Sequence, residues 1–378
     1  MMTFIVNLDY EWVLFGKTVP EGRLHRIQKE FEFIFLFVEE SKSQLYSNFI
    51  YPDDYLNSVR NYVTHLNDIT NLKKNLTNWW GKLEKLKEEK KINSKISALE
   101  ISRKINLLPE GVMVVNSFEE FLQHLDSFSI VEEFILKDPN SMGGQGNFIF
   151  RKRELGRSIL KIKSMINSGP VIFSPFFNRT YDLGTLINLE SNSLSTHLNF
   201  NTKFGIFRGG RVAPKELLPD NFVVKTISII NEYKSIGATH QLQIDSFLYQ
   251  DTNGEHKFYH LLEANYRKTM GYFIRSICHH FKNKIENPSL LIIYRSDLTV
   301  DLFHSEQQKI LLDNGMVIVS PDFLIDSLTQ EKQYLENIFL VIPSEVLRKN
   351  NSLLFFKILK PNSSTSILLN DIQGLNLN

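Results

Sequence analysis

The stretch QLQIDSFLY at 241–249, followed by KFYHLLEANYR at 257–267, decides how this chain folds. Both strings are rich in aliphatic and aromatic residues, and the segment between them contains Asn253-Gly254, the strongest short-range hairpin signal. The midpoint of positions 245 and 263 is 254, so folding back at Gly254 sets Asp245 roughly opposite Glu263. The sequence therefore predicts a β-hairpin with two carboxylates that face each other.

Two carboxylates this close repel each other unless a cation lies between them. Mg²⁺ (or Mn²⁺) suits this position, because it takes hard oxygen ligands from one or two carboxylates and completes its shell with phosphate oxygens and water. Asn265 shares the strand face of Glu263 and adds a neutral oxygen, and Arg267 follows on the same parity with a fork that fits phosphate or carboxylate. The alternative is a hairpin with solvated acidic residues. Four residues of suitable chemistry on one face favour the metal–nucleotide interpretation.

A second informative segment consists of a strand-like run, a glycine-rich turn and another strand-like run, at 134–137, 141–147 and 148–150. Glycines let backbone amides approach anionic oxygens closely. No helix and no Gly-Lys-Ser/Thr follows, which disfavours a P-loop and a dinucleotide-binding fingerprint. A flap that closes on a triphosphate and an ordinary tight turn both remain open. Lys137, at the end of the first strand, favours the flap because it could reach a phosphate, and a snorkelling surface lysine is the alternative.

Composition limits the classes of protein to which the chain could belong. The chain has 378 residues, 42% of them hydrophobic, and 43 Lys plus Arg balance 42 Asp plus Glu. Hence we expect no nucleic-acid partner and no membrane partner, although a local basic funnel stays open. A single cysteine, Cys278, no signal-peptide pattern and no apolar run near 20 residues predict a cytoplasmic protein. Cys278-His279-His280 lies in an expected helix without metal-ligand spacing, so we assign it a structural role.

Periodicity and capping signals predict an α+β chain of four parts: an N-terminal α/β domain at 1–90, two central parts at 91–170 and 171–287, and an extension at 288–378. Expected strands lie at 3–8, 31–38, 112–115, 171–177, 198–207, 290–294 and 317–319; expected helices lie at 71–91, 93–108, 118–127, 154–167 and 220–235. We expect Trp79 and Trp80 in the core, and a capping box formed by Ser117 and Glu120. The tail from about Pro361 is expected to be loosely ordered.

These residues resemble the ATP-grasp superfamily of carboxylate–amine ligases over about 93–275. The most specific match is Glu263-x-Asn265-x-Arg267, preceded by Asp245, which resembles the family's metal-binding acidic pair, metal-binding asparagine and phosphate-contacting arginine. The resemblance implies an ATP-grasp fold with a pre-ATP-grasp-like N-terminal α/β domain and a C-terminal α/β extension.

The resemblance also implies roles for further residues. Lys95 and Lys137 would reach nucleotide phosphates, and the flap would comprise Ser141, Gly143, Gly144, Gln145 and Gly146. The strand beside adenine would contribute Ser174, Phe176 and Phe177; it lacks the usual glutamate, which Asp182 could partly replace. Arg208 and Arg211 resemble the basic segment in which an arginine holds the acyl phosphate or the substrate carboxylate.

The implied reaction is attack of a substrate carboxylate on the γ-phosphate of ATP, which gives an acyl phosphate and ADP, followed by amide formation with an amine. The implied cofactors are ATP and Mg²⁺ or Mn²⁺, and the partners are small-molecule acids and amines, with amino acids and peptides among the candidates. We also expect self-association into a homodimer, and an extension that covers the active site or mediates that association. A catalytically inactive nucleotide-binding module and a phosphotransferase on the same scaffold are the alternatives.

Overall fold

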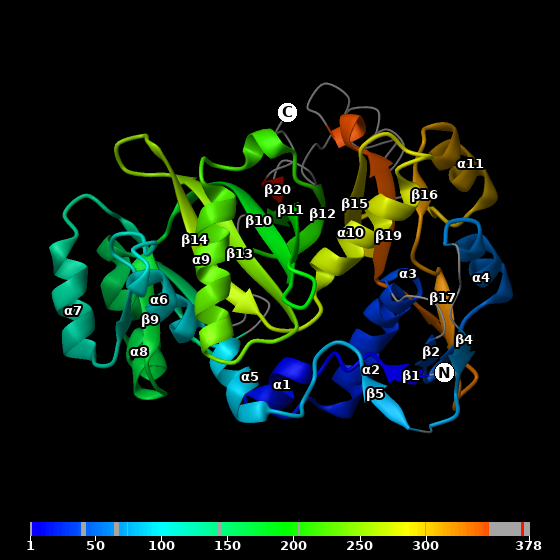
Figure 1. Ribbon diagram of the computed structural model, residues 1–378. Coiled ribbons are helices and arrows are strands. Elements are labelled where there is room, and N and C mark those ends of the chain that lie inside the picture. Colours follow the sequence, from blue (N-terminus) through cyan, green and yellow to red (C-terminus); the bar gives the residue numbers. More distant parts are fainter. Residues whose placement is uncertain are drawn as a thin grey trace.

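The computed structural model describes residues 2–38, 43–63, 68–73, 75–141, 146–202, 205–298, 300–347 and 372–373. A small sheet with its helices forms one end of the molecule, a large sheet forms the middle, and the N-terminal layer lies beside the C-terminal strands at the other end (Figure 1). No helix in these described segments is long and apolar enough to cross a bilayer.

The N-terminal layer is a parallel sheet with the order β4-β2-β1-β5, comprising β1 (Met2–Ile5), β2 (Ser43–Tyr46), β4 (Asp68–Thr70) and β5 (Leu76–Asn78). Its helices are α1 (Tyr10–Leu14), α2 (Glu21–Phe31), η1 (Glu32–Ile34), α3 (Phe35–Val38) and α4 (Asp53–Arg60). The strand predicted at 31–38 is therefore wrong, because this run is helical. Its side chains from 33 to 37 are all buried, and a short, continuously apolar run suits a buried helix as well as a buried strand.

The helix predicted over 71–91 is also wrong in its first part. Residues 76–78 form β5, which pairs with β1, and the helix α5 (Leu86–Ile92) begins ten residues after β5 does. Pairing with a central strand overrides the local helix preference of this polar segment. Trp79 and Trp80 follow β5 and are buried, which confirms their assignment to the core.

The small sheet has the order β6-β9-β7-β8 and consists of β6 (Met113–Val115), β7 (Glu133–Lys137), β8 (Asn147–Arg151) and β9 (Val171–Pro175). The elements α7 (Phe118–Ser127), η2 (Lys152–Glu154) and α8 (Leu155–Asn167) accompany it. A cluster of stacked rings, including Phe134, Phe150 and Phe173, forms its core. Ser117 caps α7 as predicted, since its Oγ accepts from the Glu120 amide at 3.1 Å, whereas the Glu120 carboxylate accepts from the Asn116 amide.

The large sheet has the order β14-β13-β10-β11-β12-β15-β19-β16, and β20 (Ile372–Gln373) pairs with β11. Its strands are β10 (Asn178–Asn188), β11 (Ser193–Thr202), β12 (Phe207–Val212), β13 (Gln241–Gln250), β14 (His256–Asn265), β15 (Pro288–Tyr294), β16 (Val317–Ile318) and β19 (Asn337–Pro343). The helices α6 (Lys95–Lys104) and α9 (Phe222–Ser235) pack against β14, whereas α10 (Met270–Phe281) packs against β12 and β15 (Figure 1).

The predicted extension completes the large sheet through β15, β19 and β16. It also contributes α11 (Ser305–Asp313), and β17 (Phe323–Asp326) and β18 (Lys332–Tyr334), which join β3 (Phe49–Ile50) in a three-stranded sheet. Short 3₁₀ turns are η3 (Lys215–Leu217), η4 (Arg295–Asp297) and η5 (Ser344–Leu347). Apart from 372–373, the tail predicted to be loosely ordered lies outside the described residues. The stretch expected as strand at 198–207 contains the end of β11 and the start of β12, with 203–204 outside the described residues, and the other expected helices and strands are confirmed with ends shifted by a few residues.

Candidate active site

The β13–β14 hairpin brings the two predicted carboxylates together. Asp245 lies directly opposite Glu263, and Gln243 lies opposite Asn265. Between this pair and the tip the register shifts, because Ser246 alone on β13 faces three residues of β14, at 260–262. Beyond the shift the pairing centres on Asn253, so the predicted turn is one residue off although the predicted facing pair is confirmed. Such bulges bend a strand and re-aim its side chains, often next to functional sites.

Asp245 is held by amides on both sides. The Gln243 Nε2 donates to Asp245 Oδ1 at 2.6 Å, and the Asn265 Nδ2 donates to Oδ2 at 2.9 Å. Burial raises the pKa of Asp245 to about 8, and the neighbouring Glu263 carboxylate adds to the effect. At neutral pH this group therefore holds a proton that a bound cation would replace.

Glu263 is the more acidic partner of the pair. Burial alone would raise its pKa, but the positive charges of Lys95, Lys137 and Arg267 together hold the pKa below its ordinary value. The Lys95 Nζ lies 3.5 Å from Glu263 Oε2, and it also donates to the backbone oxygen of Ser141 at the edge of the glycine-rich turn. Lys95 thus links the carboxylates to the flap, as expected for a side chain that contacts phosphates.

Lys137 ends β7 and faces the same space. Burial lowers its pKa to about 7, and the nearby Arg179 guanidinium adds to the lowering. In the described part of the chain, no carboxylate or carbonyl pairs with its ammonium group. A phosphate would supply a direct partner in addition to the nearby Glu263 charge, so the half-buried position favours the predicted phosphate contact over a snorkelling surface lysine.

Arg267 connects the hairpin to the N-terminal layer. Its guanidinium donates to Asn265 Oδ1 at 3.1 Å, forms an ion pair with Glu11 and lies 5.5 Å from the centroid of the Trp80 ring. The predicted metal-binding oxygen of Asn265 is therefore oriented by Arg267 and keeps one lone pair. Sequence reasoning missed Glu11, which lies on α1 without any local signal, and Gln243, which the alternation of β13 places on the face of Asp245.

The strand β9 lines a very small cavity together with Lys95 and Lys137. Ser141 and Gly146 bracket the turn, whereas Gly143, Gly144 and Gln145 lie outside the described residues. On β9 the Ser174 Oγ donates to the Pro175 oxygen. The cavity between the two sheets measures only about 10 Å³, which is room for one water molecule; its lining comprises Lys95, Leu99, Val112, Lys137, Ile172, Ser174, Tyr259 and Leu262.

The other residues predicted near adenine lie beside this cavity. The Phe177 ring packs against Tyr249, with ring centroids 4.5 Å apart, and the Phe176 amide donates to the backbone of β7. Asp182 is buried and pairs through Oδ1 with Arg179 at 2.9 Å, whereas its Oδ2 has no hydrogen-bond partner among the described residues. That oxygen is an acidic acceptor near β9, the strand in which the expected glutamate is absent.

The structure does not bring Arg208 and Arg211 to the carboxylate pair. Both lie on β12, which is three strands away from β13, or about 14 Å at the usual strand spacing. The Arg208 guanidinium stacks on Tyr294, 3.8 Å from the ring centroid, and Arg211 lines a separate cleft. Cys278 is buried and donates to the Pro288 oxygen, in agreement with a structural role.

The donor set fits a divalent cation held with a nucleotide. The carboxylates of Asp245 and Glu263 face each other beside the Asn265 amide, and the neighbouring Glu263 charge adds to the effect of burial in raising the pKa of Asp245. In the described part of the chain no group of three or more His, Cys, Asp or Glu residues could hold a metal ion. The chain would thus supply only part of a coordination shell, and phosphate oxygens and water would complete it.

The small sheet and the large sheet, with an acidic pair on the β13–β14 hairpin between them, form the architecture called ATP-grasp. Solved structures of this fold agree. The chain resembles N5-carboxyaminoimidazole synthetase from Staphylococcus aureus, with a TM-score of 0.52, 9% identity and coverage of 95% and 97% of the two chains. For the complex of that enzyme with ADP, the TM-score is 0.51 and the identity 11%, with coverage of 94% of this chain and 96% of that one. For N5-carboxyaminoimidazole ribonucleotide synthetase from Thermus thermophilus, the TM-score is 0.50 and the identity 10%, with coverage of 97% of this chain and 100% of that one. No family model matches the sequence, and no curated protein does.

These neighbours are ATP-grasp carboxylate–amine ligases, so the predicted ATP-grasp fold is confirmed. At about 10% identity the likeness establishes the fold alone.

Proposed function

We propose that the protein is an ATP-dependent, ADP-forming ligase that joins a small-molecule carboxylate to an amine. One observation carries the proposal: on an ATP-grasp fold, the half-buried Asp245–Glu263 pair faces Lys95, Lys137 and Arg267. ADP is bound in a structural neighbour of the same fold, which supports a nucleotide as the ligand. The proposed location is the cytoplasm, as the single buried thiol suggests.

The residues divide the work as follows. Asp245, Glu263 and Asn265 would hold Mg²⁺ or Mn²⁺, which supplies charge neutralisation between the phosphates when bound. Lys95 and Lys137 would neutralise the phosphate oxygens, and the flap between Ser141 and Gly146 would exclude water.

The proposed chemistry balances without a covalent protein intermediate. A carboxylate oxygen of the substrate attacks the γ-phosphorus, the bond to the bridging oxygen breaks, and ADP leaves. The amine nitrogen then attacks the acyl carbon of the acyl phosphate, inorganic phosphate leaves, and the nitrogen loses a proton. Arg267 would stabilise charge on the transferring group, for which it must share its guanidinium between Glu11 and the ligand.

A specific observation favours the alternative of an inactive module. The cavity of about 10 Å³ between the two sheets cannot hold adenine, so a nucleotide can bind only if the small sheet moves away from the large sheet. A chain in which this movement does not occur would retain the fold without the reaction.

The test combines nucleotide binding with a search for product. Calorimetric titration with MgATP should show binding, and ATP with panels of acids and amines should release ADP and phosphate, with an amide detected by mass. The variant Glu263→Gln should abolish turnover and keep the fold, whereas Glu255→Gln, at an exposed position in the same hairpin, should leave turnover intact. Turnover retained by Glu263→Gln would refute the site. Binding without any product would identify a module, and a phosphorylated product without an amide would identify a phosphotransferase.

A further inference from the structure

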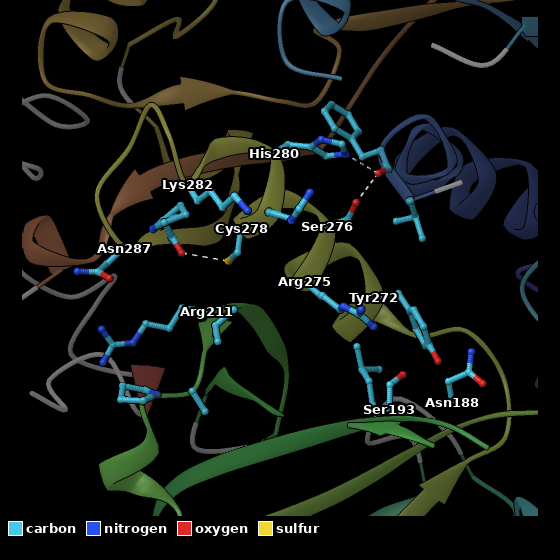
Figure 2. A pocket seen from close by; sticks show the side chains of 18 of the residues that line it. Asn188, Ser193, Arg211, Tyr272, Arg275, Ser276, Cys278, His280, Lys282 and Asn287 are labelled. Atoms are coloured by element: carbon cyan, nitrogen blue, oxygen red, sulfur yellow. Dashed lines mark hydrogen bonds between the residues drawn. The ribbon is translucent and has the colours of Figure 1, made fainter. Parts of the chain in front are cut away.

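A large cleft lies apart from the acidic pair. It encloses about 1740 Å³ between α10 with its following loop on one side and the ends of β10, β11 and β12 on the other. Figure 2 shows Arg275, Tyr272 and Lys282 on the α10 side and Arg211 and Ser193 on the sheet side, around one open space. The lining includes neither of the facing carboxylates and neither of the phosphate-contacting lysines.

The cleft is strongly positive. Four cationic side chains line it, Arg211, Lys268, Arg275 and Lys282, and Glu216 is the one carboxylate among the described lining residues. Over the whole chain the cationic and acidic residues nearly cancel, so this local excess is not a reflection of overall composition. In the described part of the chain, neither Arg275 nor Lys282 forms an ion pair.

Stabilisation of the C-terminal end of α10 explains the position of only one of these four cations. Lys282 follows the last turn of α10, where a cation stabilises the helix. Arg275, however, lies in the middle of α10, Lys268 lies before the helix, and Arg211 comes from β12. Neutral donors complete the lining, namely Asn188, Ser191, Ser193, Gln241, Tyr272 and Asn287. Convergence of cations and neutral donors from separate segments is the pattern of an anion-binding site.

A buried wall separates this cleft from the acidic pair. Gln241 lines the cleft, while Gln243, two residues along the same face of β13, donates to Asp245 and accepts from Thr269. The buried His197 fills the space beside Gln243, pressed between Gly184 and Gly271, where any Cβ would overlap its ring. An anion in the cleft would therefore bind alongside a nucleotide and not in its place.

We infer that this cleft is a second ligand site, which binds a small-molecule anion through phosphate or clustered carboxylate groups held by Arg211, Arg275 and Lys282. The site goes beyond the proposed ligase reaction, because neither its residues nor its location requires the acidic pair.

The experiment is calorimetric titration of the full chain with inorganic phosphate, pyrophosphate and citrate at low ionic strength, without nucleotide. The double variant Arg275→Gln/Lys282→Gln should bind the preferred anion at least tenfold more weakly. Arg157→Gln/Lys161→Gln, exposed on α8, removes the same charge elsewhere and should bind like the unmodified chain. Lys137→Gln should also bind normally, since it alters only the nucleotide side.

Three results would overturn the inference: no saturable binding of any of these anions by the unmodified chain, an equal loss in the α8 control, or a loss confined to Lys137→Gln. The last result would place the anion at the nucleotide phosphates. All four substituted positions of the two double variants are exposed, so both double variants should fold, which circular dichroism checks.

Discussion

Lowering the pH should weaken divalent-metal binding at the hairpin, because Asp245 must lose its proton first. Burial raises the pKa of this carboxyl to about 8, whereas its ordinary value is 3.8. Well below pH 8 each pH unit then costs about a factor of ten in apparent metal affinity, and because half of the carboxyl is already protonated at pH 8, affinity should fall about fiftyfold from pH 8 to pH 6. Above pH 8 the affinity should level off.

Calorimetric titration with Mn²⁺ in two buffers of different ionisation enthalpy measures both the affinity and the protons released. Near pH 7 we expect close to one proton per ion bound. Asp245→Asn should bind Mn²⁺ weakly and without this pH dependence, whereas Glu255→Gln in the same hairpin should behave like the unmodified chain. An affinity that stays constant from pH 6 to pH 8, with no proton released, would refute the assignment of this carboxyl as a protonated metal ligand.

The same shift has a consequence for the metal-free protein. A carboxyl whose pKa is raised by folding keeps its proton between about pH 4 and pH 8, whereas the unfolded chain has lost it. The folded state then binds more protons, so the free energy of unfolding should fall as the pH rises through this window. Thermal unfolding with a chelator should show the fall, and Asp245→Asn should remove most of it.

Two further substitutions test the surroundings of the site. Gly184→Ala should destabilise the protein by about 1–3 kcal/mol in urea unfolding, because the added methyl overlaps the buried His197 ring; His197→Ala in the same chain should recover part of the loss, and an unchanged midpoint would contradict this packing. Cys278→Ala should retain ADP release, because the thiol is buried and donates to a backbone oxygen; a complete loss of turnover in a folded variant would contradict the structural role assigned to this thiol.

The sequence was most informative where local rules determine long-range geometry. Alternation along two strands and one Asn-Gly turn predict a hairpin that brings Asp245 close to Glu263, because a hairpin leaves few registers open. The pairing at the tip centres on Asn253, and without the bulge at Ser246 it would set Asp245 opposite Leu261; the bulge restores the pair with Glu263, so two departures from the predicted register cancel.

Elsewhere the deciding forces act between distant segments. The run at 31–38 has no periodicity that separates strand from helix, and its burial against Phe273 and Phe339 settles the matter. Nothing near Glu11 indicates that it pairs with Arg267, because Glu11 lies on α1 near the N-terminus and Arg267 follows β14, far away in the sequence. The placement of Arg208 three strands from the acidic pair depends on the order of the large sheet, which strand patterns alone do not specify.

The three-stranded sheet β18-β17-β3 has a consequence for biogenesis. Ile50 and Phe49 hydrogen-bond with a strand made near the other end of the chain, and the Glu30 carboxylate accepts from the amide of Glu336, 306 positions away. The edge at β3 is therefore completed only after residues 323–336 have been synthesised. Contacts between residues so far apart in sequence make folding slow, and the unpaired strand edge exposes the partly folded chain to aggregation until they form.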